Sequence, residues 1–192
     1  MVSRTPTMPK VQVDVTVTNG TGFFDQLIDH AQPHLGTFKQ KYWWSDQYFK
    51  GPGSPVVLFT PGEIAAAGYE GYLTNRTLTG AFAQSINGAV VLLEHRYYGE
   101  SSPYQELSVK NLQYLTLKNA IADMTHFAQT VKLPFDKNGK TNAPRAPWVQ
   151  AGGSYSGALS AWTEATSPGT FWAYHSSSAP VEAISDYVSS TY

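Results

Sequence analysis

The stretch at residues 146–157 constrains this chain more than any other, because it joins three structural signals in a row. The short apolar run that opens it is typical of a buried strand. Two glycines and Ser154 follow, and the residues after Ser154 have the composition of a helix. The order predicts a serine at a sharp turn between a buried strand and a helix.

A serine on such a turn, flanked by small residues, is the nucleophile elbow of α/β hydrolases. Glycine is needed beside it because the turn strains the backbone and a neighbouring Cβ would collide. The helix directs free N–H groups and the positive end of its dipole toward a developing oxyanion. Gly152 and Ser154 fit the motif, whereas Ser156 occupies the usual position of a second glycine. We therefore predict an α/β fold of the α/β-hydrolase type, with Ser154 as nucleophile.

The rest of the chain predicts strands and helices in alternation. Residues 56–60 and 89–93 are continuous apolar runs, as expected of strands buried on both faces. Apolar residues at helical spacing begin near Thr116 and end before Pro134. The remaining expected elements are strands at 11–17, 38–44 and 171–175, helices at 78–86 and after Ser154 to about Ala165, a turn at Asn19 and Gly20, and a loop at 136–147. This pattern predicts a parallel sheet wrapped by helices.

Composition limits the partners of the chain. Its 192 residues carry a net charge of −1, which favours neither nucleic acid nor an anionic membrane. The absence of cysteine excludes disulfides and thiolate metal sites, and we expect no metal and no cofactor. No stretch approaches the roughly 20 apolar residues of a membrane span, and residues 1–10 lack the apolar region of a signal peptide. Sequons at Asn19 and Asn75 predict glycosylation, which favours a secreted protein.

A catalytic serine needs a histidine base that a carboxylate orients. In this fold the order along the chain is serine, acid, histidine. Only His175 follows Ser154, and no histidine follows the late acid Asp186. The other histidines, which include His95, precede Ser154 and so have the wrong order for the base. His30 and His34 are interpreted as structural groups near aspartates, and His126 as a surface or boundary residue. The sequence thus predicts a triad that is incomplete within these residues.

The oxyanion hole of this fold needs two N–H donors. The backbone N–H of Tyr155, the residue after the nucleophile, is the expected first donor. Gly62 lies in the loop after the predicted strand at 56–60, where the second donor is expected, although this loop could also be a simple turn. Glu63 beside it is a candidate contact for a positively charged group of a substrate, or otherwise a solvated loop acid.

The glycine-rich stretch has two alternative interpretations, a flexible loop and a phosphate cradle at a helix start. The lysine of a P-loop and the spacing G-x-G-x-x-G are both absent. An apolar strand before the glycines and a helix after them favour the elbow. Ser156 is interpreted as a small residue that permits close packing of the helix.

Four segments together resemble one peptidase family. They are G-G-S-Y-S-G at 152–157, E-H-R-Y-Y-G-E-S at 94–101, F-D-Q with D-H at 24–26 and 29–30, and S-S-A-P-V at 177–181. Over most of residues 23–190 the chain is similar to the family of lysosomal Pro-X carboxypeptidase, dipeptidyl peptidase II and the fungal acid prolyl endopeptidases. In its lack of cysteine and in the serine at position 156, the chain resembles the fungal endopeptidases more than the animal exopeptidases.

The resemblance implies a serine peptidase that cleaves proline-containing peptides or proteins on the carboxyl side of proline, is active at acid pH and is secreted or lysosomal/vacuolar. It also implies that residues 1–180 are the N-terminal part of an α/β-hydrolase domain, that residues 181–192 begin a helical cap, and that the catalytic Asp and His lie beyond Tyr192. Two alternatives stay open. One is a catalytically incomplete fragment with no activity alone, and the other is a generic α/β-hydrolase esterase.

Overall fold

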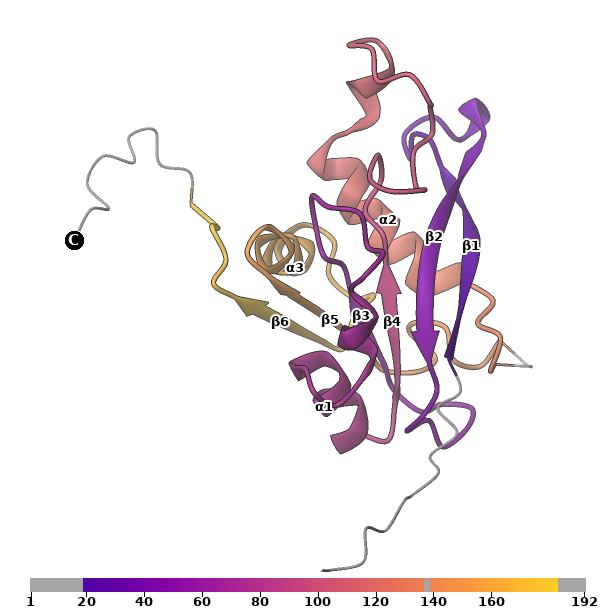
Figure 1. Cartoon of the computed structure of the whole chain (residues 1–192), viewed down its shortest axis with the longest axis vertical. Helices are drawn as coiled ribbons and strands as arrows, with labels where there is room; N and C mark the ends of the chain where they lie inside the picture. Colours follow the sequence, from indigo (N-terminus) through magenta and orange to yellow (C-terminus); the bar gives the residue numbers. More distant parts are fainter. Residues whose placement is uncertain (1–18, 137–138, 183–192) are drawn as a thin grey trace, which may run out of the picture.

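The computed structural model describes residues 19–136 and 139–182. The strand expected at 11–17, the late acid Asp186 and nearly all of the expected cap segment lie outside these ranges. Strands and helices alternate along the described chain (Figure 1), in the order β1 (Asn19–Leu27), η1 (Pro33–Leu35), β2 (Thr37–Ser45), β3 (Val56–Phe59), η2 (Glu70–Leu73), α1 (Leu78–Ser85), β4 (Ala89–Leu93), η3 (Asn111–Tyr114), α2 (Leu117–Thr130), β5 (Trp148–Gly153), α3 (Tyr155–Thr166) and β6 (Ala173–Ser177).

The six described strands form one sheet in the order β1-β2-β4-β3-β5-β6. The pairs β4–β3, β3–β5 and β5–β6 are parallel, as predicted from the alternation of strands and helices. The pairs β1–β2 and β2–β4 are antiparallel, so the expected parallel sheet is a mixed one that is parallel only from β4 to β6. For β1–β2 the reason is the short connection between the two strands, because a parallel pair needs a crossover of a dozen or more residues.

The turn expected at Asn19 and Gly20 was wrong, because both residues begin β1. Gly20 lies opposite Trp44 in the register of the β1–β2 pair. A Cβ on Gly20 would come within 2.9 Å of the Trp44 ring. The glycine here makes room for a cross-strand aromatic side chain, which is a packing role that its sequence neighbours do not reveal.

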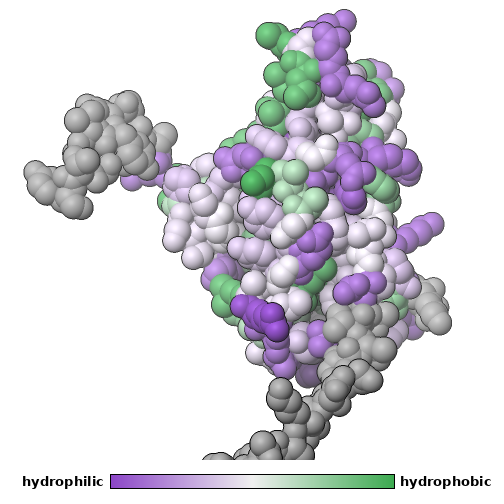
Figure 2. Space-filling view, in the orientation of Figure 1, coloured by the Kyte–Doolittle hydropathy of each residue, from purple (hydrophilic) through white to green (hydrophobic). Residues whose placement is uncertain are grey.

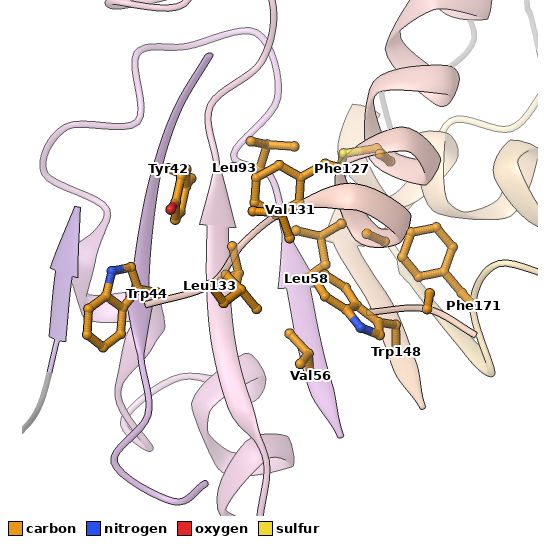
Figure 3. Packing of buried hydrophobic residues seen from close by; sticks show 14 of the residues in the cluster. Tyr42, Trp44, Val56, Leu58, Leu93, Phe127, Val131, Leu133, Trp148 and Phe171 are labelled. Atoms are coloured by element: carbon orange, nitrogen blue, oxygen red, sulfur yellow. The ribbon is translucent and has the colours of Figure 1, made fainter. Parts of the chain in front are cut away.

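The sheet separates two apolar layers, because successive strand residues point to opposite faces. Val56 and Leu58 of β3 face the larger cluster under α2 and α3, while Val57 and Phe59 face the smaller cluster on the α1 side. Figure 3 shows the larger cluster, in which Phe127 of α2 lies against the sheet. The predicted burial of residues 56–60 and 89–93 on both faces is therefore confirmed.

The helices have the predicted positions. Residues 78–86 correspond to α1, and the long amphipathic helix is α2, whose N-terminus is capped by the Thr116 hydroxyl accepting from the N–H of Asn119 at 3.2 Å. The α3 helix covers the same face of the sheet as α2 (Figure 1). None of the helices in the described part of the chain combines the length and the apolar character that a membrane span requires.

The loop between β4 and α2 protrudes from the body of the fold (Figure 1), and Figure 2 shows hydrophobic residues at its tip. Leu107 and Val109 of this loop are 54% and 91% exposed. A hydrogen bond contributes to holding its base, where the Tyr97 hydroxyl donates to the Asn111 carbonyl. Polar groups that follow β4 therefore help to position this loop.

A buried ion pair joins the segment after β4 to α2 beneath that loop. The Arg96 guanidinium donates to both carboxylate oxygens of Asp123, at 2.7 and 2.6 Å. Its remaining N–H groups donate to the carbonyls of Leu27, Ile28 and Tyr114. Arg96 is fully buried and Asp123 is 2% exposed, so each charge depends on the other for compensation.

We predict that Asp123→Asn lowers the free energy of unfolding by about 3 kcal/mol, because it leaves the Arg96 charge buried without its counter-ion. Urea unfolding followed by circular dichroism measures the loss. Asp25→Asn is the matched control, because the Asp25–Lys39 pair has both side chains more than 60% exposed and contributes about 0.5 kcal/mol. Equal losses in the two variants would contradict the structural role assigned to Asp123.

Candidate active site

Ser154 lies at the point where β5 ends and α3 begins. Its backbone has φ 55° and ψ −131°, a conformation that non-glycine residues rarely adopt. The side chain is exposed, and the backbone N–H donates to the carbonyl of Ser177 on β6 at 3.0 Å. The serine is thus presented to solvent on a strained turn between a buried strand and a helix, as an elbow requires.

Close backbone contacts explain the glycines around this turn. A Cβ on Gly152 would come within 2.1 Å of the Ser156 carbonyl oxygen, and one on Gly157 within 2.8 Å of the Ser177 carbonyl oxygen. Gly153 has free space for a Cβ, with its nearest contact at 3.9 Å. The side chain of Ser156 is 2% exposed and its hydroxyl has no hydrogen-bond partner, so this serine fills space at the buried start of α3.

The loop after β3 packs against the first turn of α3. Gly62 has φ +85°, and a Cβ there would lie 2.9 Å from Ser156 Oγ and 3.2 Å from Cδ1 of the Tyr155 ring. The N–H groups of the first helical turn have no partner within the helix, and the first helical bond runs from Ala158 N–H to the Ser154 carbonyl. The two segments expected to form an oxyanion hole are therefore adjacent in space.

A pocket of about 350 Å³ opens beside Ser154. One wall is aromatic, because Phe59 and Tyr72 stack with ring centroids 4.4 Å apart and Tyr69 continues the stack at 5.7 Å. His175 of β6 shares the pocket with Ser154 and makes an edge-to-face contact with the Phe82 ring. The pocket offers a mainly apolar surface next to an exposed hydroxyl.

A second pocket, of about 310 Å³, is lined in part by the loop that carries Gly62, through Glu63. Its lining includes Glu63, His95, Tyr155 and Trp162. Glu63 is exposed, while His95 is only 6% exposed. The His95 ring forms a hydrogen bond with the Tyr155 hydroxyl at 3.0 Å, so the residue after Ser154 is tied to the end of β4.

The sequence pattern did not predict that His95 would form a hydrogen bond with the residue after Ser154. The only available signal was its position just beyond the buried strand at 89–93, between the charged residues Glu94 and Arg96. His30 contacts Asp123 at 2.8 Å, as expected of a structural group, and His34 lies exposed. His126 is a half-buried boundary residue that contacts the Gln26 side chain at 2.8 Å.

Comparisons with known proteins give both a family and a fold. The model of the family described as serine carboxypeptidase S28 matches residues 26–192. The serine protease vicPb of Bipolaris victoriae is 50% identical over 92% of this chain and 33% of its own length. Human lysosomal Pro-X carboxypeptidase is 31% identical over 95% of this chain and 36% of its own length. The chain therefore spans about a third of the length of the curated relatives it matches.

Among solved structures, the esterase Pf2001 of Pyrococcus furiosus superposes with a TM-score of 0.55 at 12% identity, over 88% of this chain and 52% of that one. This likeness concerns the fold alone. The predicted α/β-hydrolase fold and the resemblance inferred from the four motifs are both confirmed.

We predict that Gly152→Ala destabilises the protein by about 3 kcal/mol, because the new Cβ meets backbone atoms that cannot move without unwinding the start of α3. Thermal unfolding measures the effect. Gly153→Ala is the matched control one residue away, and we expect it to unfold within a few degrees of the unmodified protein. A Gly152→Ala variant as stable as Gly153→Ala would refute the close packing described for the elbow.

Proposed function

The chain belongs to the serine carboxypeptidase S28 family, and we propose that it carries the nucleophile of a serine peptidase that cleaves on the carboxyl side of proline. In this proposal Ser154 Oγ forms a bond to the carbonyl carbon of the scissile peptide while its proton passes to a histidine base. The C–N bond then breaks as the proton moves to the leaving amine, and water hydrolyses the acyl-enzyme.

The observation that carries this proposal is the strained, exposed position of Ser154 at the end of β5. The adjacent N-terminus of α3 supports an oxyanion hole made by the Tyr155 N–H and a backbone N–H of the Gly62 loop. The contact of Gly62 with the first turn of α3 agrees with this pairing. Glu63, exposed in the neighbouring pocket, is proposed as a contact for a positively charged group of the substrate.

The base is proposed to come from an Asp and His pair outside this chain. His175 on β6 is the only histidine after Ser154 in this sequence. The acid between the two, Glu164, is exposed on α3, and His175 contacts the Phe82 ring. The relatives are about three times as long as the matched segment, which agrees with a pair encoded farther along. The chain alone is then expected to be inactive.

Cleavage after proline, activity at acid pH and a secreted or lysosomal/vacuolar location are proposed by analogy with relatives such as lysosomal Pro-X carboxypeptidase. The substrate is accordingly a proline-containing peptide or protein, and no role for nucleic acid or a membrane is proposed. The sequon residues Asn19 and Asn75 are both exposed, as glycosylation requires.

We predict that a fluorophosphonate probe labels the longest chain encoded by this gene and that Ser154→Ala abolishes the labelling, because the probe reacts with an activated serine hydroxyl. Ser156→Ala is the matched control, since its hydroxyl is buried without a partner two residues away, and it should be labelled at the unmodified rate. In-gel fluorescence and mass spectrometry of the labelled peptide report the site. Labelling that survives Ser154→Ala would refute the assignment of the nucleophile.

Matched peptides with proline or alanine before the scissile bond separate this function from a generic esterase. We expect kcat/KM to favour proline by roughly 100-fold, as complementary side-chain pockets do, and to be higher at acidic than at neutral pH. Simple acyl esters serve as the comparison substrate. Equal turnover of the two peptides together with rapid ester hydrolysis would instead support the esterase alternative.

A further inference from the structure

We propose that His95 is a positioning residue of the oxyanion hole, which it holds in shape by fixing the Tyr155 side chain against the Gly62 loop. The inference rests on the proposed function, because it assigns a part to a residue outside the expected triad. We draw it from the contacts of His95, a buried histidine to which the proposed mechanism gives no other part.

The hydrogen bonds of His95 determine which ring nitrogen carries the proton. Its Nδ1 lies 2.9 Å from the Arg96 carbonyl oxygen, which can only accept, so Nδ1 is the protonated nitrogen. In the neutral ring Nε2 is then an acceptor, and it lies 3.0 Å from the Tyr155 hydroxyl. Tyr155 therefore donates its O–H to Nε2.

The charge states of the two groups preserve this arrangement. Burial lowers the pKa of His95 below its ordinary value, which favours the neutral ring. Burial, with the negative charge of Glu63 as a smaller cause, raises the pKa of Tyr155 to about 12. Tyr155 therefore keeps its proton as the donor, and burial favours the neutral His95 ring as the acceptor.

The position of His95 is itself fixed by the residues on either side of it. The buried Glu94 carboxylate accepts from the N–H groups of Ala66 and Glu100 and from the Ser101 hydroxyl. Arg96 is held by the ion pair described above. Since both neighbours are anchored, the His95 ring offers Tyr155 a fixed acceptor.

Tyr155 transmits this constraint to both proposed N–H donors. Its own N–H is one of them, directly after the strained Ser154. Its ring lies against Gly62, where a Cβ would come within 3.2 Å of Cδ1. Without the bond to His95 the ring gains other rotamers, and the Gly62 loop loses the surface on which it rests. The spacing of the two donors then varies, and stabilisation of the oxyanion weakens.

The test uses the full-length peptidase with Tyr155→Phe, His95→Leu and His95→Gln. Loss of one oxyanion donor costs roughly 100-fold or more in kcat, so its misplacement should lower kcat about tenfold in Tyr155→Phe and in His95→Leu. KM should change less than about twofold, because ground-state binding does not use the oxyanion donors. His95→Gln retains an acceptor near the position of Nε2 and should recover most of kcat.

Two further measurements separate positioning from a general structural effect. A peptide boronate, which forms a tetrahedral adduct with the serine, should bind about tenfold more weakly to Tyr155→Phe and His95→Leu. The double variant His95→Leu/Tyr155→Phe should be no slower than either single variant, since both remove the same bond. Tyr114→Phe is the control for loss of a tyrosine hydroxyl elsewhere, and thermal unfolding confirms that each variant is folded.

The outcomes are distinguishable from failure of the proposed function. If the unmodified enzyme is labelled at Ser154 but the variants retain its kcat and boronate affinity, the role of His95 is overturned and the peptidase function stands. A rise in KM with unchanged kcat would also overturn it, because His95 would then contribute to substrate binding. If the unmodified enzyme is not labelled at Ser154, the proposed function falls and the role of His95 falls with it.

Discussion

The ion pair between Arg96 and Asp123 is the interaction on which the arrangement of this structure most depends. It lies where β1, β4, α2 and the loop before α2 meet, and the guanidinium also donates to three backbone carbonyls. A buried pair adds little net stability over apolar packing, but breaking it leaves an uncompensated charge. Its value here is therefore geometric, because only one arrangement of these elements satisfies all the donors and acceptors.

The ion pair also bears on the elbow, because Arg96 is next in the chain to His95, which bonds to Tyr155. Arg96 anchors the chain directly after His95, and Glu94 anchors it directly before. The strained backbone of Ser154 is sustained in turn by tight contacts at Gly152 and Gly157 and by the bond to Ser177 on β6. Strain at a functional residue persists only where the surroundings over-determine it. The buried polar groups that follow β4 and the glycines on either side of Ser154 together supply that support.

Prediction from the sequence succeeded where the signal was local. The apolar runs of β3 and β4, the amphipathic stripe of α2 and the strand-to-helix turn at Ser154 each follow from neighbouring residues. It failed at β1, where Asn19 and Gly20 resemble a turn but Gly20 is selected by the Trp44 ring across the strand. It also missed the antiparallel pairs β1–β2 and β2–β4, because strand direction depends on pairing partners that the chain order does not name.

The sequence by itself determined the α/β pattern, the elbow with Ser154 and the family resemblance, because periodicity and short motifs are properties of residues close together in the chain. Only the tertiary structure decided what His95 does. Its partner Tyr155 is 60 residues away. His95 follows β4 and Tyr155 begins α3 after β5, and β3 lies between these two strands in the sheet. A hydrogen bond of that kind depends on how the sheet is ordered and how its ends are anchored, and these are consequences of packing the whole chain.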